Sequence, residues 1–253
     1  MARGSAGESV LHRHLRVLGA FETRHPFLTL GEVAERSGLP ASTTHRLLAE
    51  LEREGLVDRW PEDRTYRLGV RLYELASRTP GALGLRETAR PFLAQVHAAV
   101  RQHAQLGVLA GTDVLYIDRL SARDSAINHT IIGGRIPLHA SCIGLVLLAH
   151  SDSELIDEVI AAGMTAYTEF TITTPQALRR EVARVRRDGF SVTDGHIHRD
   201  SRGIGVPVIG PHGRVYGGIG LVVPSDGTNP APQIEVLREA AAGITRKLAQ
   251  ALE

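Results

Sequence analysis

Hydroxyl and guanidinium groups gather between residues 40 and 67, where they could bind the phosphates and base edges of nucleic acid. The run Pro40-Ala-Ser-Thr-Thr-His-Arg brings both kinds of group to the start of one predicted helix. Such side chains donate hydrogen bonds to phosphate oxygens and to bases in a DNA groove. Further arginines lie in a hairpin-like stretch, where the natural ligand is a phosphate or the adjacent minor groove. The predicted DNA-binding residues are Pro40, Ala41, Ser42, Thr43, Arg46, Arg59 and Arg64.

Local signals predict the elements that hold these residues in place. Thr29 and Glu32 form a capping box at the start of a helix that ends at Gly38. A second helix begins after Pro40 and runs to about residue 54, with positions 44, 47, 48 and 51 inward and 41, 42, 43 and 46 outward. Short strands at 56–60 and 65–68 flank a turn. This order is typical of a winged helix-turn-helix that inserts its second helix into a major groove. A merely solvated hairpin remains the alternative for the arginines.

Helical spacing also precedes and follows this unit. Apolar residues recur at helical intervals on two neighbouring rows, so we expect a first helix that packs beneath the other two. The rows are Leu11, Leu15 and Leu18, and Val10, Val17 and Phe21. A short helical stretch at 69–79 ends at Pro80-Gly81 and is the predicted connector. A longer helix is expected at 85–104.

Beyond residue 104 the apolar pattern changes from helical spacing to alternation. Strands are expected at 105–110 and 114–120, joined by a hairpin turn at 111–113, and residues 126–132 fit a third strand. Residues 133–137 are expected to form a loop. Further helices are expected at 141–150, 151–162, 174–188 and 233–252, and further strands at 190–194, 203–209 and 216–223. The order of elements predicts an α+β domain built on one antiparallel sheet.

Composition narrows the class of protein. A chain of 253 residues is long enough for two domains. The longest apolar run is too short to span a bilayer and the N-terminus lacks a signal peptide, so we expect a cytoplasmic protein without a membrane partner. Cys142 is the only cysteine, which excludes an internal disulfide. Residues 1–80 carry 12 arginines against 11 acidic residues, so tight DNA binding requires pairing of two chains.

The order and spacing of four segments resemble the IclR family of bacterial transcription regulators, from about residue 10 to 252. The segments are Pro40-Ala-Ser-Thr-Thr-His-Arg-Leu-Leu, Pro137-Leu-His-Ala-Ser-Cys-Ile-Gly, Gly189-Phe-Ser-Val-Thr-Asp, and Val206-Pro-Val followed by Gly213-Arg-Val. The resemblance implies a winged helix-turn-helix DNA-binding domain at 8–68, a linker helix at 69–83 and a GAF-like effector-binding and oligomerisation domain at 84–253. It also implies double-stranded operator DNA and a small-molecule effector as partners, with self-association as a dimer or a dimer of dimers. No cofactor is expected.

The resemblance further implies an effector pocket between the sheet and the helix that follows Pro137-Leu-His-Ala. Amides at the start of that helix suit a carboxylate. Family members that bind very small acids have polar side chains where this chain has Gly203, Gly220 and Val222, so we expect a larger, less polar acid that is aromatic or branched. The hypothesis is a repressor of a catabolic operon. The predicted effector-binding residues are Ser125, Asn128, Ile136, Cys142, Ile143, Thr193, Gly203, Gly220 and Val222.

Two other interpretations of the same region stay open. The first is a metal-responsive regulator, because histidine and cysteine are suitable ligands for zinc and related ions. The residues that could approach one another are His129, His139, Cys142, His196, His198 and His212. The second is an enzyme with Cys142 as nucleophile and His139 beside it. Against it, the sequence lacks the glycine two residues before the nucleophile and an acidic partner for the base, so no catalytic residue is assigned.

Overall fold

The computed structural model describes residues 8–22, 25–60, 62–78, 82–122, 125–210 and 213–250. Contacts divide the chain into two compact units, residues 1–79 and 80–253. Across the described ranges, no helix combines the length and the apolar character needed to cross a membrane. Each unit has its own apolar core.

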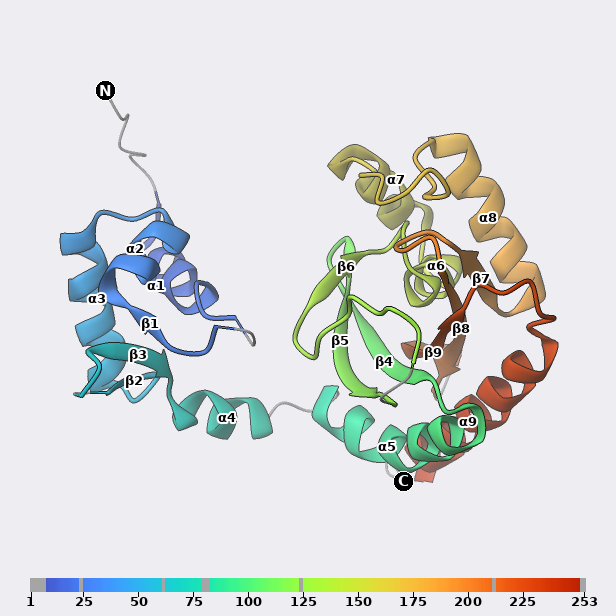
Figure 1. The fold of residues 1–253 in the computed structure, drawn as a ribbon, viewed down its shortest axis with the longest axis horizontal. Coiled ribbons are helices and arrows are strands. Elements are labelled where there is room, and N and C mark those ends of the chain that lie inside the picture. Colours follow the sequence, from blue (N-terminus) through green and yellow to red (C-terminus); the bar gives the residue numbers. More distant parts are fainter. Residues whose placement is uncertain are drawn as a thin grey trace. The chain divides into compact units, whose positions relative to one another are not determined.

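The first unit is the winged helix-turn-helix that the sequence predicted (Figure 1). Its helices are α1 (Val10–Gly19), α2 (Leu30–Ser37), α3 (Ala41–Arg53) and α4 (Val70–Ser77), and its strands are β1 (Leu28–Thr29), β2 (Val57–Trp60) and β3 (Thr65–Leu68). The strands form an antiparallel sheet in the order β1-β3-β2. The capping box of Thr29 and Glu32 is present, and Gly38 ends α2 in the left-handed conformation that glycine favours. The local signals therefore determine this turn.

Of the two apolar rows predicted for α1, only part is buried in this unit. Val17 and Phe21 are buried against α2 and α3, but Leu11 and Leu15 are 68% and 55% exposed. The helical period was right, yet it does not reveal which of two apolar rows meets the rest of the same chain. Helix α4 likewise has no buried residue, and Val70 and Tyr73 are among its most exposed apolar side chains. One unit thus leaves two helices with uncovered apolar faces.

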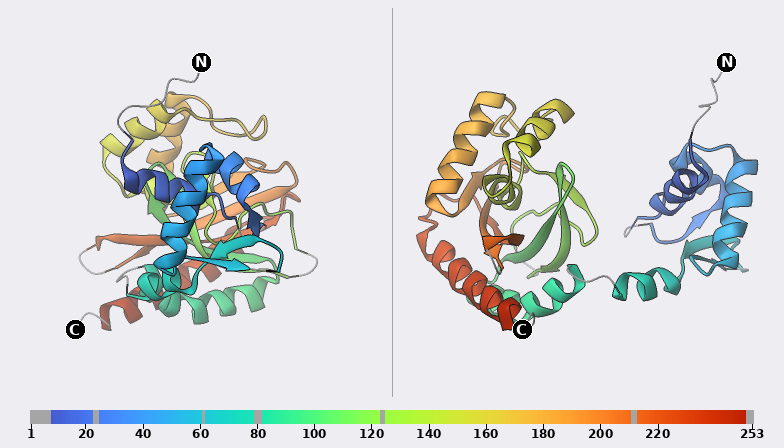
Figure 2. Two further views of the ribbon diagram at one scale, coloured as in Figure 1. Left: turned by 90° about the vertical axis from the view of Figure 1, so that its left-hand side faces the viewer. Right: turned by 180° about the vertical axis from the view of Figure 1, so that it is seen from behind.

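The second unit is built on a six-stranded antiparallel sheet in the order β6-β5-β4-β9-β8-β7. The strands are β4 (His103–Ala110), β5 (Asp113–Leu120), β6 (Arg135–Pro137), β7 (Ser191–Asp194), β8 (Ser201–Ile209) and β9 (Val215–Pro224). Helices α5 (Ala82–Val100) and α9 (Ala231–Gln250) lie along one face (Figures 1 and 2). The other face carries α6 (Cys142–Ala149), with α7 (Ser153–Ala162) and α8 (Pro175–Asp188) outside it (Figure 1). The α+β prediction is confirmed.

Each face of this sheet buries its own apolar cluster. On the side of α5 and α9, the core includes Leu93, Leu106 and Ile244. On the side of α6, the core includes Tyr116, Leu145 and Leu178, and every residue of α6 is buried. A helix that is apolar on all sides must be enclosed, so α6 is held rigidly against the sheet, and its first turn has a fixed position.

Two expected elements differ from the structure. Residues 126–132 form no strand; they run as an irregular segment, and the edge strand is β6 at Arg135–Pro137, where a loop was expected. Helix α5 ends at Val100 instead of 104, because Arg101 has a positive φ of 55° and β4 then begins at His103. Alternation alone could not separate a paired strand from an extended segment that side chains hold in place.

Candidate functional site

Helix α3 presents the predicted polar face outward. Thr44, Leu47, Leu48 and Leu51 are buried, which turns the opposite side of the first two turns toward solvent. Pro40 is the N-cap residue, and Ala41, Ser42 and Arg46 are exposed, while Thr43 is half-buried. The structure therefore gathers the five predicted helix positions on one surface.

Arg46 lies on that surface with a weak intrahelical partner. Its Nη1 is 3.8 Å from Oε1 of Glu50, and its side chain is 63% exposed. Glu50 is also bound by His14, whose Nε2 lies 2.9 Å from Oε2. An exposed ion pair at this spacing contributes little free energy, so the guanidinium is available to a phosphate or a base.

The β2–β3 hairpin carries arginines that pack on aromatic rings. The Arg59 guanidinium lies 5.8 Å from the ring centroid of Tyr66, and that of Arg67 lies 4.7 Å from Trp60. Arg64 is exposed in the turn with a φ of 52°. A positive φ is uncommon for a residue other than glycine. Here it occurs in the tight turn between β2 and β3, where Arg64 is exposed and lies outside the paired strands.

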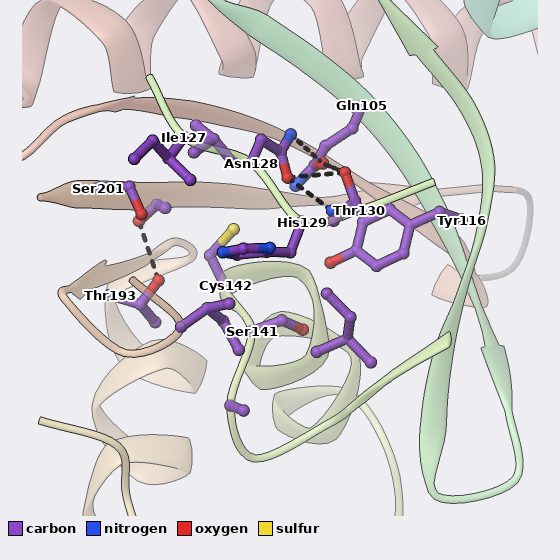
Figure 3. Close-up of a pocket in the computed structure, with 15 residues that line it drawn as sticks. Gln105, Tyr116, Ile127, Asn128, His129, Thr130, Ser141, Cys142, Thr193 and Ser201 are labelled. Atoms are coloured by element: carbon purple, nitrogen blue, oxygen red, sulfur yellow. Dashed lines mark hydrogen bonds between the residues drawn. The ribbon is translucent and has the colours of Figure 1, made fainter. Parts of the chain in front are cut away.

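In the second unit, a cavity lies between the sheet, the first turn of α6 and the segment 125–130 (Figure 3). Of the predicted effector residues, Asn128, Ile136, Cys142, Thr193, Gly203 and Val222 line it, whereas Ser125, Ile143 and Gly220 are absent from its lining. The lining residues that were not predicted to bind the effector are Gln105, Tyr116, Ile127, His129, Thr130, Ala140, Ser141, Ile197 and Ser201. Gln105 carried a usable signal, because a buried polar residue inside an apolar strand is unusual.

The first turn of α6 forms one wall of the cavity. Ser141 is the N-cap residue, and its Oγ accepts a hydrogen bond of 3.0 Å from the Gly144 amide. The backbone nitrogen of Ile143 lies close to strand β8, since a Cβ placed on Gly205 would be 3.2 Å from it. Ser141 and Cys142 line the cavity, so the positive end of the α6 dipole is offered to it there.

The predicted role of Gly203 and Gly220 in freeing space is wrong. A Cβ on Gly203 would lie 2.5 Å from Thr193 Oγ1 and 3.0 Å from Cys142 Sγ. A Cβ on Gly220 would lie 2.9 Å from the Ile204 carbonyl and 3.4 Å from the same sulfur. Neighbouring side-chain and backbone atoms already fill the space that these glycines leave. The glycines therefore allow α6 to approach β8 and β9 closely, and do not enlarge the cavity.

Cys142 and Tyr116 are buried in the cavity wall as neutral groups. Burial raises the pKa of the Cys142 thiol to about 12 and also raises the pKa of the Tyr116 phenol. The thiolate, not the thiol, is the nucleophile, so Cys142 is unreactive at neutral pH. The structure gives no support to Cys142 as a catalytic nucleophile.

The histidines that the structure describes near the cavity do not assemble a metal site. The rings of His129 and His198 lie with their centroids 5.8 Å apart. His139 is buried with Nε2 donating to the Thr165 carbonyl at 3.1 Å, and burial lowers the pKa of both His139 and His196. Over the described residues, no three His, Cys, Asp or Glu side chains are placed to hold a metal ion. His212 lies outside the described residues.

Comparison with protein families matches both units. The IclR helix-turn-helix domain model covers residues 10–61, and the model for the C-terminal domain of bacterial transcriptional regulator IclR covers residues 79–246. The chain belongs to the IclR family of bacterial transcriptional regulators. The IclR proteins that it resembles are regulators and not enzymes, which agrees with the unreactive thiol.

Individual IclR relatives match over most of their length. HTH-type transcriptional regulator XynR of Escherichia coli strain K12 is 30% identical over 83% of this chain and 84% of its own. Transcriptional repressor IclR of the same strain is 28% identical over 73% and 68%. A crystal structure of an IclR homolog from Microbacterium hydrocarbonoxydans, complexed with 4-hydroxybenzoate, is 39% identical and superposes with a TM-score of 0.88 over 95% of this chain and 99% of that one.

Proposed function

We propose that the protein is a ligand-responsive operator-binding regulator whose effector is a small aromatic carboxylic acid. The observation that carries the proposal is the cavity at the first turn of α6, which joins a helix N-terminus to apolar walls. In this proposal residues 8–68 read DNA, residues 69–83 link, and residues 84–253 bind the effector and oligomerise. The 4-hydroxybenzoate complex of a relative supports the same class of ligand.

The lining of the cavity suits an acid with an aromatic ring. Ile127, Ile136 and Val222 supply apolar surface for the two faces of a ring. The α6 N-terminus, beside the Ser141 hydroxyl, favours the carboxylate, because its backbone dipole is positive there. Thr193 and Asn128 add polar groups that fix an orientation. A short aliphatic acid would leave most of the apolar wall uncovered.

The cavity must widen to admit this ligand. Its volume is about 40 Å³, well below the roughly 150 Å³ of an engineered cavity that binds benzene. Ile127 and His129 line it and are also exposed, so they lie at its mouth (Figure 3). Both belong to the irregular segment that follows residue 124, and this segment is the wall that must move when the effector enters.

Operator binding would use two chains. The first unit has no strong excess of positive charge, and one recognition helix contacts only a short stretch of DNA. Paired helices about 34 Å apart would meet successive major grooves. The exposed apolar faces of α1 and α4, which include Leu11, Leu15, Val70 and Tyr73, favour self-association as a dimer or a dimer of dimers. The protein would act in the cytoplasm, as a repressor of a catabolic operon.

Thermal unfolding with matched ligands tests the effector class. A ligand that binds only the native state raises the midpoint, and binding at 100 times Kd is worth about 2.7 kcal/mol. We expect 4-hydroxybenzoate to raise the midpoint and 4-hydroxybenzyl alcohol, which lacks the carboxylate, to leave it unchanged. Replacing Thr193 with Val, which removes one polar group of the cavity wall, should weaken the effect of the acid. Equal shifts with acid and alcohol, or no shift with any aromatic acid, would contradict the proposal.

A further inference from the structure

Strand β5 contains a β-bulge beside the cavity. Leu106 of β4 pairs with Asp118 of β5, but the next β4 residue, Gly107, pairs with Tyr116, so that Ile117 is an extra residue. A bulge re-aims the side chains that follow it. Tyr116 therefore points into the core beneath α6, whereas Asp118 lies on the side of α5, and Arg119 reaches the segment 125–130.

Asp118 binds helix α5. Its carboxylate is fully buried and accepts from Arg90, whose Nη1 lies 2.9 Å from both Oδ1 and Oδ2. Arg86, one turn earlier, approaches the same carboxylate with Nε at 3.6 Å from Oδ2. Removal of either arginine would leave a fully buried carboxylate with less compensating charge, which is unfavourable. The first half of α5 is therefore tied to residue 118.

Arg119 follows Asp118 at the end of β5 and contacts the segment 125–130. Its Nη1 donates to the carbonyl of Thr130, and its Nε donates to Ser121 Oγ at 2.8 Å. The backbone amide of Arg119 donates to Asp118 Oδ1 at 2.9 Å. The Asp118 carboxylate, which binds α5, is thus hydrogen-bonded to Arg119, which binds the segment 125–130.

The segment that Arg119 reaches is the wall at the mouth of the cavity. Thr130 Oγ1 donates to Gln105 Oε1 at 2.9 Å, and its amide donates to Asn128 Oδ1 at 2.9 Å (Figure 3). His103 Nε2 donates to the Ala126 carbonyl at 2.6 Å. Asn128, Thr130 and Gln105 line the cavity. Displacing this segment therefore strains or breaks the contact between Thr130 and Arg119.

We propose that Asp118 and Arg119 are a positioning pair that couples the mouth of the effector cavity to helix α5. This inference rests on the proposed function, because it assigns a route for the response of that site. Helix α5 is the first element of the second unit and follows the linker in sequence. Entry of a ligand moves the segment 125–130, Arg119 transmits the displacement to Asp118, and Asp118 shifts α5 through Arg86 and Arg90. Coupling of this kind is reciprocal.

Reciprocity gives a test that needs no ligand. Amide hydrogen exchange of the full-length protein is measured in Arg119→Gln, which loses the Thr130 contact, and in Asp118→Asn, which loses the ion pairs to α5. We expect Arg119→Gln to speed exchange in the first half of α5, and Asp118→Asn to speed exchange at Ala126 and Thr130, each by about fivefold or more. If Asp118→Asn does not fold, Arg90→Gln serves in its place, since Arg86 still faces the carboxylate. Changes confined to the element that each substitution touches would overturn the proposal.

A control and a second arm separate this inference from the proposed function. Arg179→Gln removes an exposed ion pair with Asp157 in the helices on the other face of the sheet, and should alter neither region. In the second arm, 4-hydroxybenzoate should change exchange in α5 of the wild type, while in Arg119→Gln it should still raise the unfolding midpoint but leave α5 unchanged. A ligand response in α5 that survives Arg119→Gln would overturn the coupling. Failure of the acid to bind the wild type would count against the effector class alone, because the first arm still decides the coupling.

Discussion

The imidazole rings of His129 and His198 lie with their centroids 5.8 Å apart and their planes tilted by 39°. His129 is also at the mouth of the cavity, which it lines together with Cys142 (Figure 3). The contact with His198 therefore helps to hold a side chain over a cavity of about 40 Å³, which is too small for an aromatic acid. The size of the cavity therefore depends on the side chain of His129, which can be tested by substitution.

Replacing His129 with Ala should improve binding of aromatic acids. The substitution removes a ring that must be displaced, so the cost of widening the cavity falls, and acids bulkier than 4-hydroxybenzoate should also bind. Isothermal titration of 4-hydroxybenzoate and a larger homologue measures both effects, with an expected gain of about threefold to tenfold in affinity, or about 1 kcal/mol. His198→Ala, which keeps the ring of His129, is the control and should give a smaller gain. Weaker binding in His129→Ala would instead show that the imidazole contacts the ligand.

Replacing Gly203 with Ala should destabilise the second unit by about 1–3 kcal/mol, because overpacking forces neighbouring groups to move. The added Cβ would lie 2.5 Å from Thr193 Oγ1. Urea unfolding measures the loss. Gly84→Ala is the matched control, since nothing lies within 4 Å of its Cβ and the residue is in α5, where alanine is favoured. Equal stabilities for the two variants would mean that α6 can retreat from β8 without cost.

Stability should fall as the pH drops below about 6.5. Burial lowers the pKa of His103, His139 and His196 in the folded protein. In the unfolded chain these groups have their ordinary pKa near 6.5, so on acidification the unfolded state binds protons that the folded state does not. The free energy of unfolding then decreases by about 1.4 kcal/mol per pH unit for each such proton, until the folded pKa is reached.

A single substitution isolates one of these protons. His139→Gln keeps a donor for the Thr165 carbonyl but cannot be protonated. Denaturant unfolding between pH 7 and pH 5 should show a shallower pH dependence in this variant than in the wild type. If the pH dependence of the unfolding free energy is unchanged, protonation of His139 does not destabilise the folded protein.

Replacing Arg46 with Ala should weaken DNA binding and flatten its salt dependence if the guanidinium contacts a phosphate. Each phosphate contact contributes about 0.9 to the slope of log K against log salt. Fluorescence anisotropy with duplex DNA at several salt concentrations gives the slope. Arg53→Ala, in the last turn of the same helix, is the control and should retain it. If Arg46→Ala shows both the wild-type slope and the wild-type affinity, Arg46 does not contact DNA.

The winged helix-turn-helix was predictable because its signals are local. Thr29, Glu32 and Gly38 specify the two ends of α2 by contacts within a few residues, and the buried residues of α3 follow from its helical period. Six of the nine predicted effector positions lie around one cavity, since the motifs that carried them recur in fixed order. These positions remain proposals for ligand binding.

Contacts between distant parts of the chain were not predictable. The bulge at Ile117, which separates the directions of Tyr116 and Asp118, depends on pairing with β4 and leaves no trace in the composition of β5. The glycines of β8 and β9 read as open space in the sequence, but packing of α6 fills that space. Residues 126–132 alternate like a strand, yet side-chain hydrogen bonds rather than a partner strand hold them.

Ligand-responsive regulation is tested most directly by measuring operator affinity in the absence of 4-hydroxybenzoate and at a concentration that saturates the protein. Duplexes selected from a random library by the full-length protein provide the operator, and thermal unfolding establishes saturation by 4-hydroxybenzoate. We predict that saturation changes the Kd for the selected duplex by about fivefold or more, while the weaker binding to an unselected duplex stays nearly unchanged. The same Kd at zero and saturating 4-hydroxybenzoate would contradict ligand-responsive regulation by this acid.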